Sequence, residues 1–253
     1  CGGPEFFSGG SKILTASTPN GKLTPAHIAD YARRRSDIHY PKPSVVTVTQ
    51  TTEVGTCYTI EELADIGVAC RELGLHFHMD GARFANAVAA MKMPPKELTW
   101  QVGVDVLCLG GTKNGMPVGD AVVFFDRELA YEFEYRCKQA GQLASKMRFL
   151  AAPWVAMLQD GCWLKHARHA NAMAARLEER LSSLQGVELL FPREANAVFV
   201  SMPPRWHDWL KSRGWKYYDF IGKGGARFMC SWATTEADVD ALANDLDACA
   251  TVA

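Results

Sequence analysis

Two short stretches of the sequence carry side chains that could perform chemistry together. In "HMDGARFANA", a carboxylate and a guanidinium stand three residues apart, at Asp80 and Arg83. Further along, in "CLGGTKNGMPVGDAVVFF", Lys113 lies among glycines between two strand-like runs. A lysine that a cleft holds partly desolvated becomes an imine-forming amine. A carboxylate at the end of a strand can pair with a protonated ring nitrogen and keep a pyridine-type cofactor an electron sink.

Each of these residues also has a plainer interpretation. Lys113 could be a solvated loop lysine, and "GGTKNG" could suggest a phosphate loop, although the spacing G-x-x-x-x-G-K-[ST] is not matched. Asp80 stands where a strand gives way to a helix, so it could cap that helix. Arg83 taken alone could be a surface or ion-pair arginine. The functional interpretation therefore depends on these residues occurring together.

The segments around these residues alternate between strand-like and helix-like patterns. β-Branched and apolar runs predict strands over residues 44–50, 75–80, 104–111 and 121–126. Capping residues and apolar spacing predict helices over residues 24–35, 59–74 and 81–91. Thr59 and Glu62 have the spacing of a capping box, and Gly74 ends that helix. The alternation predicts an α/β fold with parallel βαβ units, helices on both faces of the sheet, and a site at the carboxyl ends of the strands.

The pattern becomes helical after residue 127. Residues 127–158 and 163–184 have long amphipathic patterns, and short strand-like pieces and a final helix follow them. We therefore expect a large domain over residues 1–165 and a small C-terminal α+β domain over residues 166–253.

Composition limits the classes of protein that need to be considered. The chain has 253 residues, of which 48% are hydrophobic and 22% charged, as in an ordinary globular protein. A net charge of -1 gives no reason to expect nucleic acid or an anionic membrane as a partner. No apolar run approaches the ~20 residues that a membrane span needs. None of the eight cysteines has C-x-x-C spacing, so we expect free thiols in a reduced, cytoplasmic setting.

The two stretches together resemble the threonine aldolase family of pyridoxal phosphate (PLP) enzymes, fold type I. That family has the motif H-x-D-G-A-R, with the cofactor-bonding lysine about thirty residues later in a small-residue strand–turn–strand. "CGGPEFFSGGSKIL" and "RCKQAGQLASKMRFLAAPW" resemble the low-specificity bacterial members, and the resemblance covers essentially the whole chain. It implies a large domain like that of aspartate aminotransferase, with a mostly parallel sheet, followed by a small C-terminal domain.

The resemblance also implies a role for each matched residue. Lys113 matches the lysine that bonds to PLP, Asp80 the acid that pairs with the ring nitrogen, and Arg83 the arginine beside the phenolic oxygen. "DIHYPKPSVVTV" resembles the segment whose histidine lies near the substrate hydroxyl, which selects His39, although a surface histidine is the alternative. "GGARFMCSWATTEADVDAL" resembles the segment whose arginine binds the substrate carboxylate in a two-point fork, which selects Arg227.

A metal site is a weaker alternative at the same strand. His76 and His78 are two residues apart and hence on one face, and with Asp80 they could form H-x-H-x-D. Inside a covered parallel sheet, such histidines are more often core residues satisfied by hydrogen bonds. We therefore expect no metal.

The expected activity is PLP-dependent cleavage of threonine or related β-hydroxy-α-amino acids to glycine and an aldehyde, with Lys113 and His39 as catalytic residues. The alternatives are another fold-type-I reaction, such as β-elimination or racemisation, and a truncated, non-catalytic relic that forms oligomers. The chain begins with Cys1, and family members have a further N-terminal region that carries the phosphate loop and the ring-stacking side chain. We therefore expect that region to be missing here, which leaves the activity of this chain open. By analogy with the family, we expect a homodimer or homotetramer.

Overall fold

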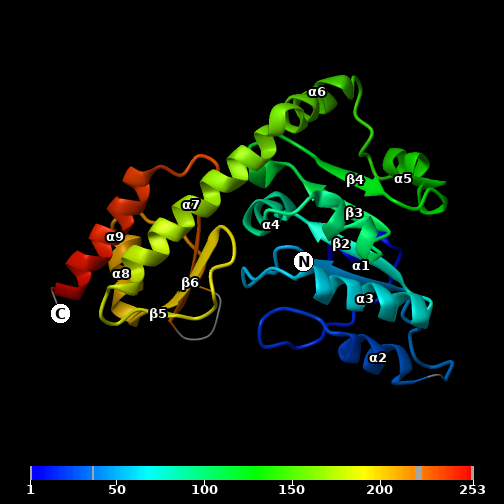
Figure 1. The fold of residues 1–253 in the computed structure, drawn as a ribbon, viewed down its shortest axis with the longest axis horizontal. Coiled ribbons are helices and arrows are strands. Elements are labelled where there is room, and N and C mark those ends of the chain that lie inside the picture. The colour runs from blue at the N-terminus through cyan, green and yellow to red at the C-terminus, as the bar shows by residue number, and fades with distance from the viewer. Residues whose placement is uncertain (1, 36, 220–223, 252–253) are drawn as a thin grey trace.

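The computed structural model describes residues 2–35, 37–219 and 224–251 (Figure 1). Within these residues the strands form two separate sheets, and the long helix α7 (Cys162–Ser182) runs from the larger sheet to the smaller one (Figure 1). The larger sheet contains β1 (Val45–Thr49), β2 (His76–Gly81), β3 (Val106–Gly110) and β4 (Asp120–Phe124), in that order. This arrangement confirms the predicted α/β fold.

The strand directions in the larger sheet follow from the lengths of the connections. β1, β2 and β3 are parallel, as the alternating pattern predicts, and Asp80 pairs in register with Thr49 on one side and Cys108 on the other. β4 runs antiparallel to β3. Residues 111–119, which join these two strands, are too few to form a crossover helix, so the chain must turn back.

The N-terminal helices are α1 (Gly3–Phe7), α2 (Pro25–Arg33), α3 (Ile60–Leu73) and α4 (Phe84–Met91). Three of them, α2, α3 and α4, begin and end close to the predicted bounds, whereas α1 was not predicted. The Thr59 hydroxyl accepts from the Glu62 amide (3.2 Å), and the Glu62 carboxylate accepts from the Thr59 amide (2.8 Å). Gly74 ends α3 in the left-handed conformation, with φ 65°. Both ends of the predicted capping pattern are confirmed.

Helices cover one face of the larger sheet within the described residues. Val48, Phe77 and Met79 are buried there, in one apolar cluster with residues of α2, α3 and α4. The alternate positions are more open: the side chains of Val45 and Val122 remain 51% and 37% exposed. The second face is covered in part, because α5 (Phe133–Gln139) contacts it through Phe133, whose ring centroid lies 4.9 Å from that of Phe124.

The segment after β4 differs from the expected long helix. It forms η4 (Glu128–Ala130), α5 (Phe133–Gln139), α6 (Arg148–Leu158) and η5 (Gln159–Gly161). Gly141 and Lys146 have positive φ angles of 71° and 59°, which a helix cannot accommodate. The amphipathic pattern over 127–158 thus belongs to several short helices, and the prediction of one long helix is wrong.

The C-terminal part surrounds a second apolar core. Its elements after α7 are β5 (Glu188–Leu189), β6 (Ala197–Ser201), α8 (Pro204–Ser212), β7 (Gly225–Met229) and α9 (Glu236–Thr251). β6 lies between β5 and β7 and is antiparallel to both. Leu177, Leu181 and Trp206 are buried in this core, which shares no residue with the core of the larger sheet. The expected division at 165/166 falls within α7, the helix that joins the two parts.

The remaining short helices connect these elements. They are η1 (Pro95–Leu98), η2 (Trp100–Val102) and η3 (Thr112–Asn114). A search of the described residues found no helix with the length and apolar character that crossing a bilayer requires.

Gly67 in α3 offers a test of the close packing against η2. A Cβ atom at this position would lie 2.0 Å from the backbone oxygen of Val102. Alanine normally stabilises a helix interior relative to glycine by about 1 kcal/mol. Here the overlap should outweigh that gain, and we expect Gly67→Ala to lower the free energy of unfolding by about 1–3 kcal/mol in urea titrations. Val68→Ala, at an exposed position of the same helix, is the control. A Gly67→Ala protein as stable as wild type would contradict this packing.

Candidate active site

The predicted cofactor residues follow neighbouring parallel strands at one edge of the larger sheet. Asp80 is the second-last residue of β2, and Lys113 lies in η3, directly after β3. The carboxyl ends of parallel strands meet at the same edge, which is where α/β proteins bind ligands. The structure therefore places the amine and the acid at one edge, as the sequence predicts.

A cavity of about 860 Å³ opens beside this edge. Arg83, Lys113 and Arg227 line it together, and so does Glu53, which the sequence analysis did not select. Its other walls come from α7 and from the C-terminal part, including residues 215–218, 228–231, 238, 239 and 242. The cavity thus lies where the two parts of the chain meet.

Contacts with the start of α7 hold the turn that carries Lys113. The buried Asn114 side chain donates a hydrogen bond to the Trp163 carbonyl (2.9 Å). His166 Nδ1 lies 2.9 Å from the Asn114 carbonyl, and its ring stacks on Trp232 with the centroids 5.7 Å apart. The sequence analysis missed these positioning residues, since Trp163, His166 and Trp232 are distant from Lys113 along the chain.

Glycines allow the ends of β2 and β3 to approach closely. A Cβ atom on Gly110 would lie 2.6 Å from the Cα and the carbonyl oxygen of Ala82. A Cβ atom on Gly111 would lie 2.7 Å from the Trp154 ring. A side chain at Gly110 would therefore separate the segment that carries Lys113 from the segment that carries Asp80 and Arg83, and one at Gly111 would displace the same turn from Trp154.

A local turn orients the Asp80 carboxylate. Its Oδ1 atom accepts a hydrogen bond from the Ala82 amide (2.9 Å). This bond closes a turn ahead of α4, whose N-cap residue is Arg83, so the interpretation of Asp80 as the cap of that helix is wrong. The bond uses one carboxylate oxygen of Asp80. Asp80 is partly buried and is not among the residues that line the cavity directly.

The strand positions beside Asp80 are poorly hydrated. Burial lowers the pKa of His78, although the Asp80 charge acts in the opposite direction. Burial, and then the Asp80 charge, raise the pKa of the Cys108 thiol. An ionised carboxylate in such surroundings interacts strongly with a cation placed next to it.

Arg83 stands at the residue before α4, with its side chain on the cavity. Burial lowers the pKa of Arg83, the nearby Arg227 acts in the same direction, and the charges of Glu53 and Asp80 oppose them. The guanidinium therefore lies among two acids and a second arginine. An anionic ligand between the two arginines would relieve their repulsion.

Arg227 comes to the cavity from β7 of the second sheet. Its side chain is 14% exposed, and its Nη1 atom lies 3.7 Å from Glu53 Oε2. Its guanidinium also lies over the Tyr218 ring, 4.8 Å from the centroid. Tyr218 and Arg227 are further joined through a backbone hydrogen bond of 2.7 Å.

The structure does not bring His39 to this cavity. Its side chain is 81% exposed, with Nδ1 3.3 Å from Asp37 Oδ1. It precedes β1 (Val45–Thr49), whereas the cavity lies beyond the carboxyl ends of the parallel strands. The local sequence around His39 carries no information about which edge of the sheet it reaches. The proposed role of His39 near a substrate hydroxyl gains no support from its position.

The two histidines of β2 have separate partners. His76 Nδ1 lies 3.7 Å from Asp105, and His78 Nε2 lies 3.3 Å from the Cys108 sulfur. A search of the described residues found no group of three His, Cys, Asp or Glu side chains that could hold a metal ion.

The residues at this edge fit PLP by the chemistry of their side chains. Lys113 supplies an amine, Asp80 an acid partly shielded from water, and Arg83 a guanidinium that lines the cavity with Lys113 and is influenced by the Asp80 charge. Arg227 adds a second guanidinium from β7 of the smaller sheet. Fold and site together define a PLP-dependent enzyme of fold type I.

Comparisons with known proteins agree with this class. The model of the beta-eliminating lyase family matches residues 1–203, and the chain belongs to this family. It is similar to the low specificity L-threonine aldolase of Pseudomonas sp. strain NCIMB 10558, with 61% identity over 248 residues, 98% of this chain and 72% of that protein. The corresponding protein of Pseudomonas aeruginosa is 61% identical over 97% of this chain and 71% of its own length. A solved Leishmania major threonine aldolase superposes with a TM-score of 0.88 at 28% identity, over 96% of this chain and 72% of that one.

Proposed function

We propose that this protein is a PLP-dependent aldolase that cleaves threonine and related β-hydroxy-α-amino acids to glycine and an aldehyde. The observation that carries the proposal is the meeting of Lys113, Arg83 and Arg227 on one cavity, with Asp80 at the same edge of the sheet. Similarity to L-threonine aldolases supports the choice of substrate.

The site residues divide between the cofactor and the substrate. When bound, PLP supplies a ring that withdraws electron density from the α-carbon of an amino acid. In this proposal Lys113 holds the cofactor covalently, Asp80 keeps a proton on the ring nitrogen, and Arg83 lies beside the phenolic oxygen. Arg227 binds the substrate carboxylate through a two-point fork, which restricts the orientation of the Cα–Cβ bond.

Other reactions use the same kind of site, because fold does not determine reaction. β-Elimination and racemisation would need the same lysine and acid. Incubation of the full chain with PLP and L-threonine distinguishes cleavage from elimination: cleavage releases glycine and acetaldehyde, whereas elimination releases ammonia. A non-catalytic relic would release neither and would develop no absorption band of covalently bound PLP.

Three further features belong to the same proposal. The division into residues 1–165 and 166–253 treats α7 as the connection between a cofactor domain and a small domain. Assembly as a homodimer or homotetramer is supported by exposed aromatic side chains on the 131–149 segment, such as Tyr131, Tyr135 and Phe149. A cytoplasmic location is supported by the cysteines, which are free thiols wherever the structure describes them.

Arg227→Ala tests the substrate half of the site. We expect KM for threonine to rise by a factor on the order of 10², since truncating one partner of a desolvated charge pair typically costs about 2–5 kcal/mol. Cofactor affinity, measured by absorbance titration, should stay unchanged because Lys113, Asp80 and Arg83 remain. Arg227→Lys keeps the charge but loses the fork, so its KM should be intermediate. An unchanged KM in Arg227→Ala would exclude Arg227 from carboxylate binding.

A further inference from the structure

One carboxylate on the cavity has no role in the assignments above. Glu53 lies in the loop between β1 and α3, four residues after β1 ends at Thr49. Its carboxylate is 3.7 Å from Arg227 Nη1, and its side chain is 68% exposed. It shares the cavity wall with Lys113 and Arg83. Glu53 therefore stands at the same edge of the sheet as the cofactor residues, beside the arginine assigned to the substrate.

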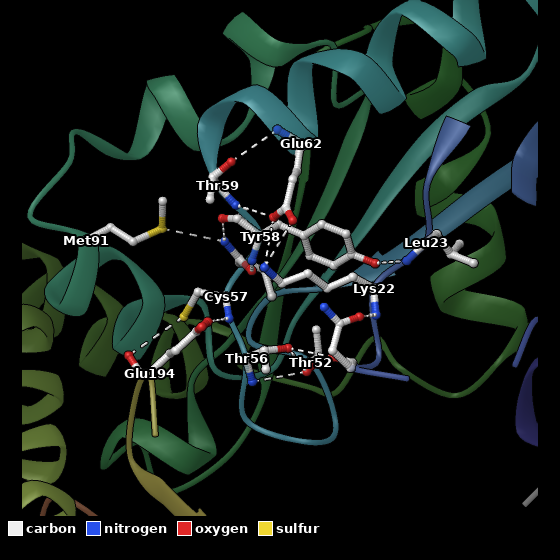
Figure 2. A network of polar contacts seen from close by, with 12 residues as sticks. Lys22, Leu23, Thr52, Thr56, Cys57, Tyr58, Thr59, Glu62, Met91 and Glu194 are labelled. Atoms are coloured by element: carbon white, nitrogen blue, oxygen red, sulfur yellow. Dashed lines mark hydrogen bonds and ion pairs between the residues drawn. The ribbon is translucent and has the colours of Figure 1, made fainter. Parts of the chain in front are cut away.

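The turn that carries Glu53 is held by short hydrogen bonds. The Thr52 amide donates to the Thr56 carbonyl (2.9 Å), and the two threonine hydroxyls lie 2.7 Å apart. Gly55, with φ 83°, donates its amide to the Thr52 carbonyl (3.0 Å). Both threonines are buried. Figure 2 shows the contact between Thr52 and Thr56, which restricts the turn although the Glu53 side chain itself is exposed.

Buried groups secure the chain beyond the turn as well. The Gln50 side chain donates to the Tyr58 carbonyl (3.0 Å) and accepts from the Tyr58 amide (2.9 Å). The Cys57 amide donates to the Glu194 carboxylate, which ties the loop to the segment before β6 (Figure 2). A loop fixed at these points presents Glu53 to the cavity at a small entropic cost.

Three other groups among the described lining residues are less suited than Glu53 to accept a proton. The Asp238 carboxylate accepts from the amide and the hydroxyl of Thr235 at 2.8 and 2.7 Å. Burial raises the pKa of the Cys230 thiol to about 12. Burial also raises the pKa of Tyr217 to about 12, and its hydroxyl lies 3.0 Å from His207 Nδ1. The carboxylates among the described lining residues are those of Glu53 and Asp238, and Glu53 is the one that lies beside Arg227.

The geometry of the substrate places its hydroxyl near this carboxylate. In a β-hydroxy-α-amino acid, the hydroxyl-bearing carbon is attached to the α-carbon, as the carboxylate is. A substrate whose carboxylate is bound by Arg227 therefore holds its hydroxyl within a few ångströms of that guanidinium. Glu53, which already contacts the Arg227 guanidinium, lies within reach of that hydroxyl.

We propose that Glu53 is the catalytic residue that accepts the proton of the substrate's β-hydroxyl as the Cα–Cβ bond breaks. The proton passes to the carboxylate, the O–H electron pair becomes the second carbon–oxygen bond of the aldehyde, and the Cα–Cβ pair stays with the α-carbon. The inference rests on the proposed function and deepens it, because it names a proton acceptor for the step that the sequence analysis had assigned to His39.

Glu53→Gln tests the proposal, because it keeps the shape of the side chain and removes the proton acceptor. We expect kcat for threonine cleavage to fall by a factor of roughly 10²–10⁴, the usual contribution of a general base. The exchange of glycine α-protons with deuterated water, followed by NMR, should be retained because glycine has no β-hydroxyl. Glu53→Asp should recover part of the lost rate. PLP affinity and melting temperature should match those of wild type and of Glu72→Gln, an exposed control on α3.

Three outcomes would overturn the role of Glu53. The first is a wild-type kcat in Glu53→Gln. The second is an equal fall in the rates of glycine proton exchange and threonine cleavage. This would mean that the substitution acts before the bond-breaking step. The third is a change confined to the KM values for threonine and glycine. This would mean that Glu53 acts only as a counter-ion of Arg227. These outcomes require a wild-type chain that cleaves threonine; if it does not, the proposed function fails, and this role fails with it.

Discussion

Replacing Lys113 with alanine should abolish covalent attachment of PLP and lower kcat for threonine cleavage by a factor on the order of 10⁴ or more. Lys113 is the amine on the cavity that lies at the carboxyl edge of the sheet, directly after β3. Asn114 and His166 hold its turn through contacts that do not involve the lysine side chain. The fold should therefore survive the substitution while the chemistry does not.

The measurement is the absorption band that develops when PLP is added, recorded together with the release of acetaldehyde. Lys113→Arg is the matched variant, because it keeps a positive charge but supplies no imine-forming amine. Lys165→Ala, which removes an exposed lysine from the nearby start of α7, should behave as wild type. A band of unchanged intensity in Lys113→Ala would mean that PLP bonds elsewhere, and the assignment of the site would be wrong.

Asp80→Asn should lower kcat by a factor of roughly 10²–10³ while leaving the fold intact. The asparagine Oδ1 atom can still accept the hydrogen bond from the Ala82 amide, so the local turn is preserved. What is lost is the negative charge that, in the proposed site, would keep a proton on the ring nitrogen of the cofactor. The expected loss is therefore in the rate rather than in stability.

Comparison with Asp80→Ala separates the two roles of this residue. Alanine removes the turn-forming hydrogen bond as well as the charge, which should cost about 1 kcal/mol of stability in addition to the lost rate. Kinetics and urea unfolding of both variants provide the test. If Asp80→Asn unfolds, the residue is structural. If it retains full activity, the proposed pairing with the ring nitrogen is refuted.

Elements with local signals were predictable from sequence because the interactions that end them are local. The capping box of Thr59 and Glu62 and the left-handed Gly74 lie within one helix and its ends, so the residues themselves reveal them. The segment after β4 was mispredicted for a related reason. Amphipathic spacing continues across Gly141 and Lys146, but it does not show whether the backbone turns at those residues.

The site was predictable to the extent that it lies at strand ends. Asp80, Arg83 and Lys113 follow β2 and β3, and the rule that parallel strands share a carboxyl edge brings them together. The same rule applied to β1 points to the loop that carries Glu53, a signal that the sequence analysis did not use. Arg227 was found through the family resemblance, because nothing local marks an arginine on a distant strand as part of this cavity.

By itself the sequence determined the order of strands and helices, the capped ends of α3, the amine and acid at one edge of the sheet, and the family. The tertiary structure decided that Arg227 of the second sheet faces Glu53 of the first, and that His39 points to solvent. The physical reason is the separation along the chain between the residues that interact. Capping and alternation are interactions between near neighbours, whereas the cavity forms only when two separate apolar cores pack around α7 and bring residues from distant parts of the chain within a few ångströms.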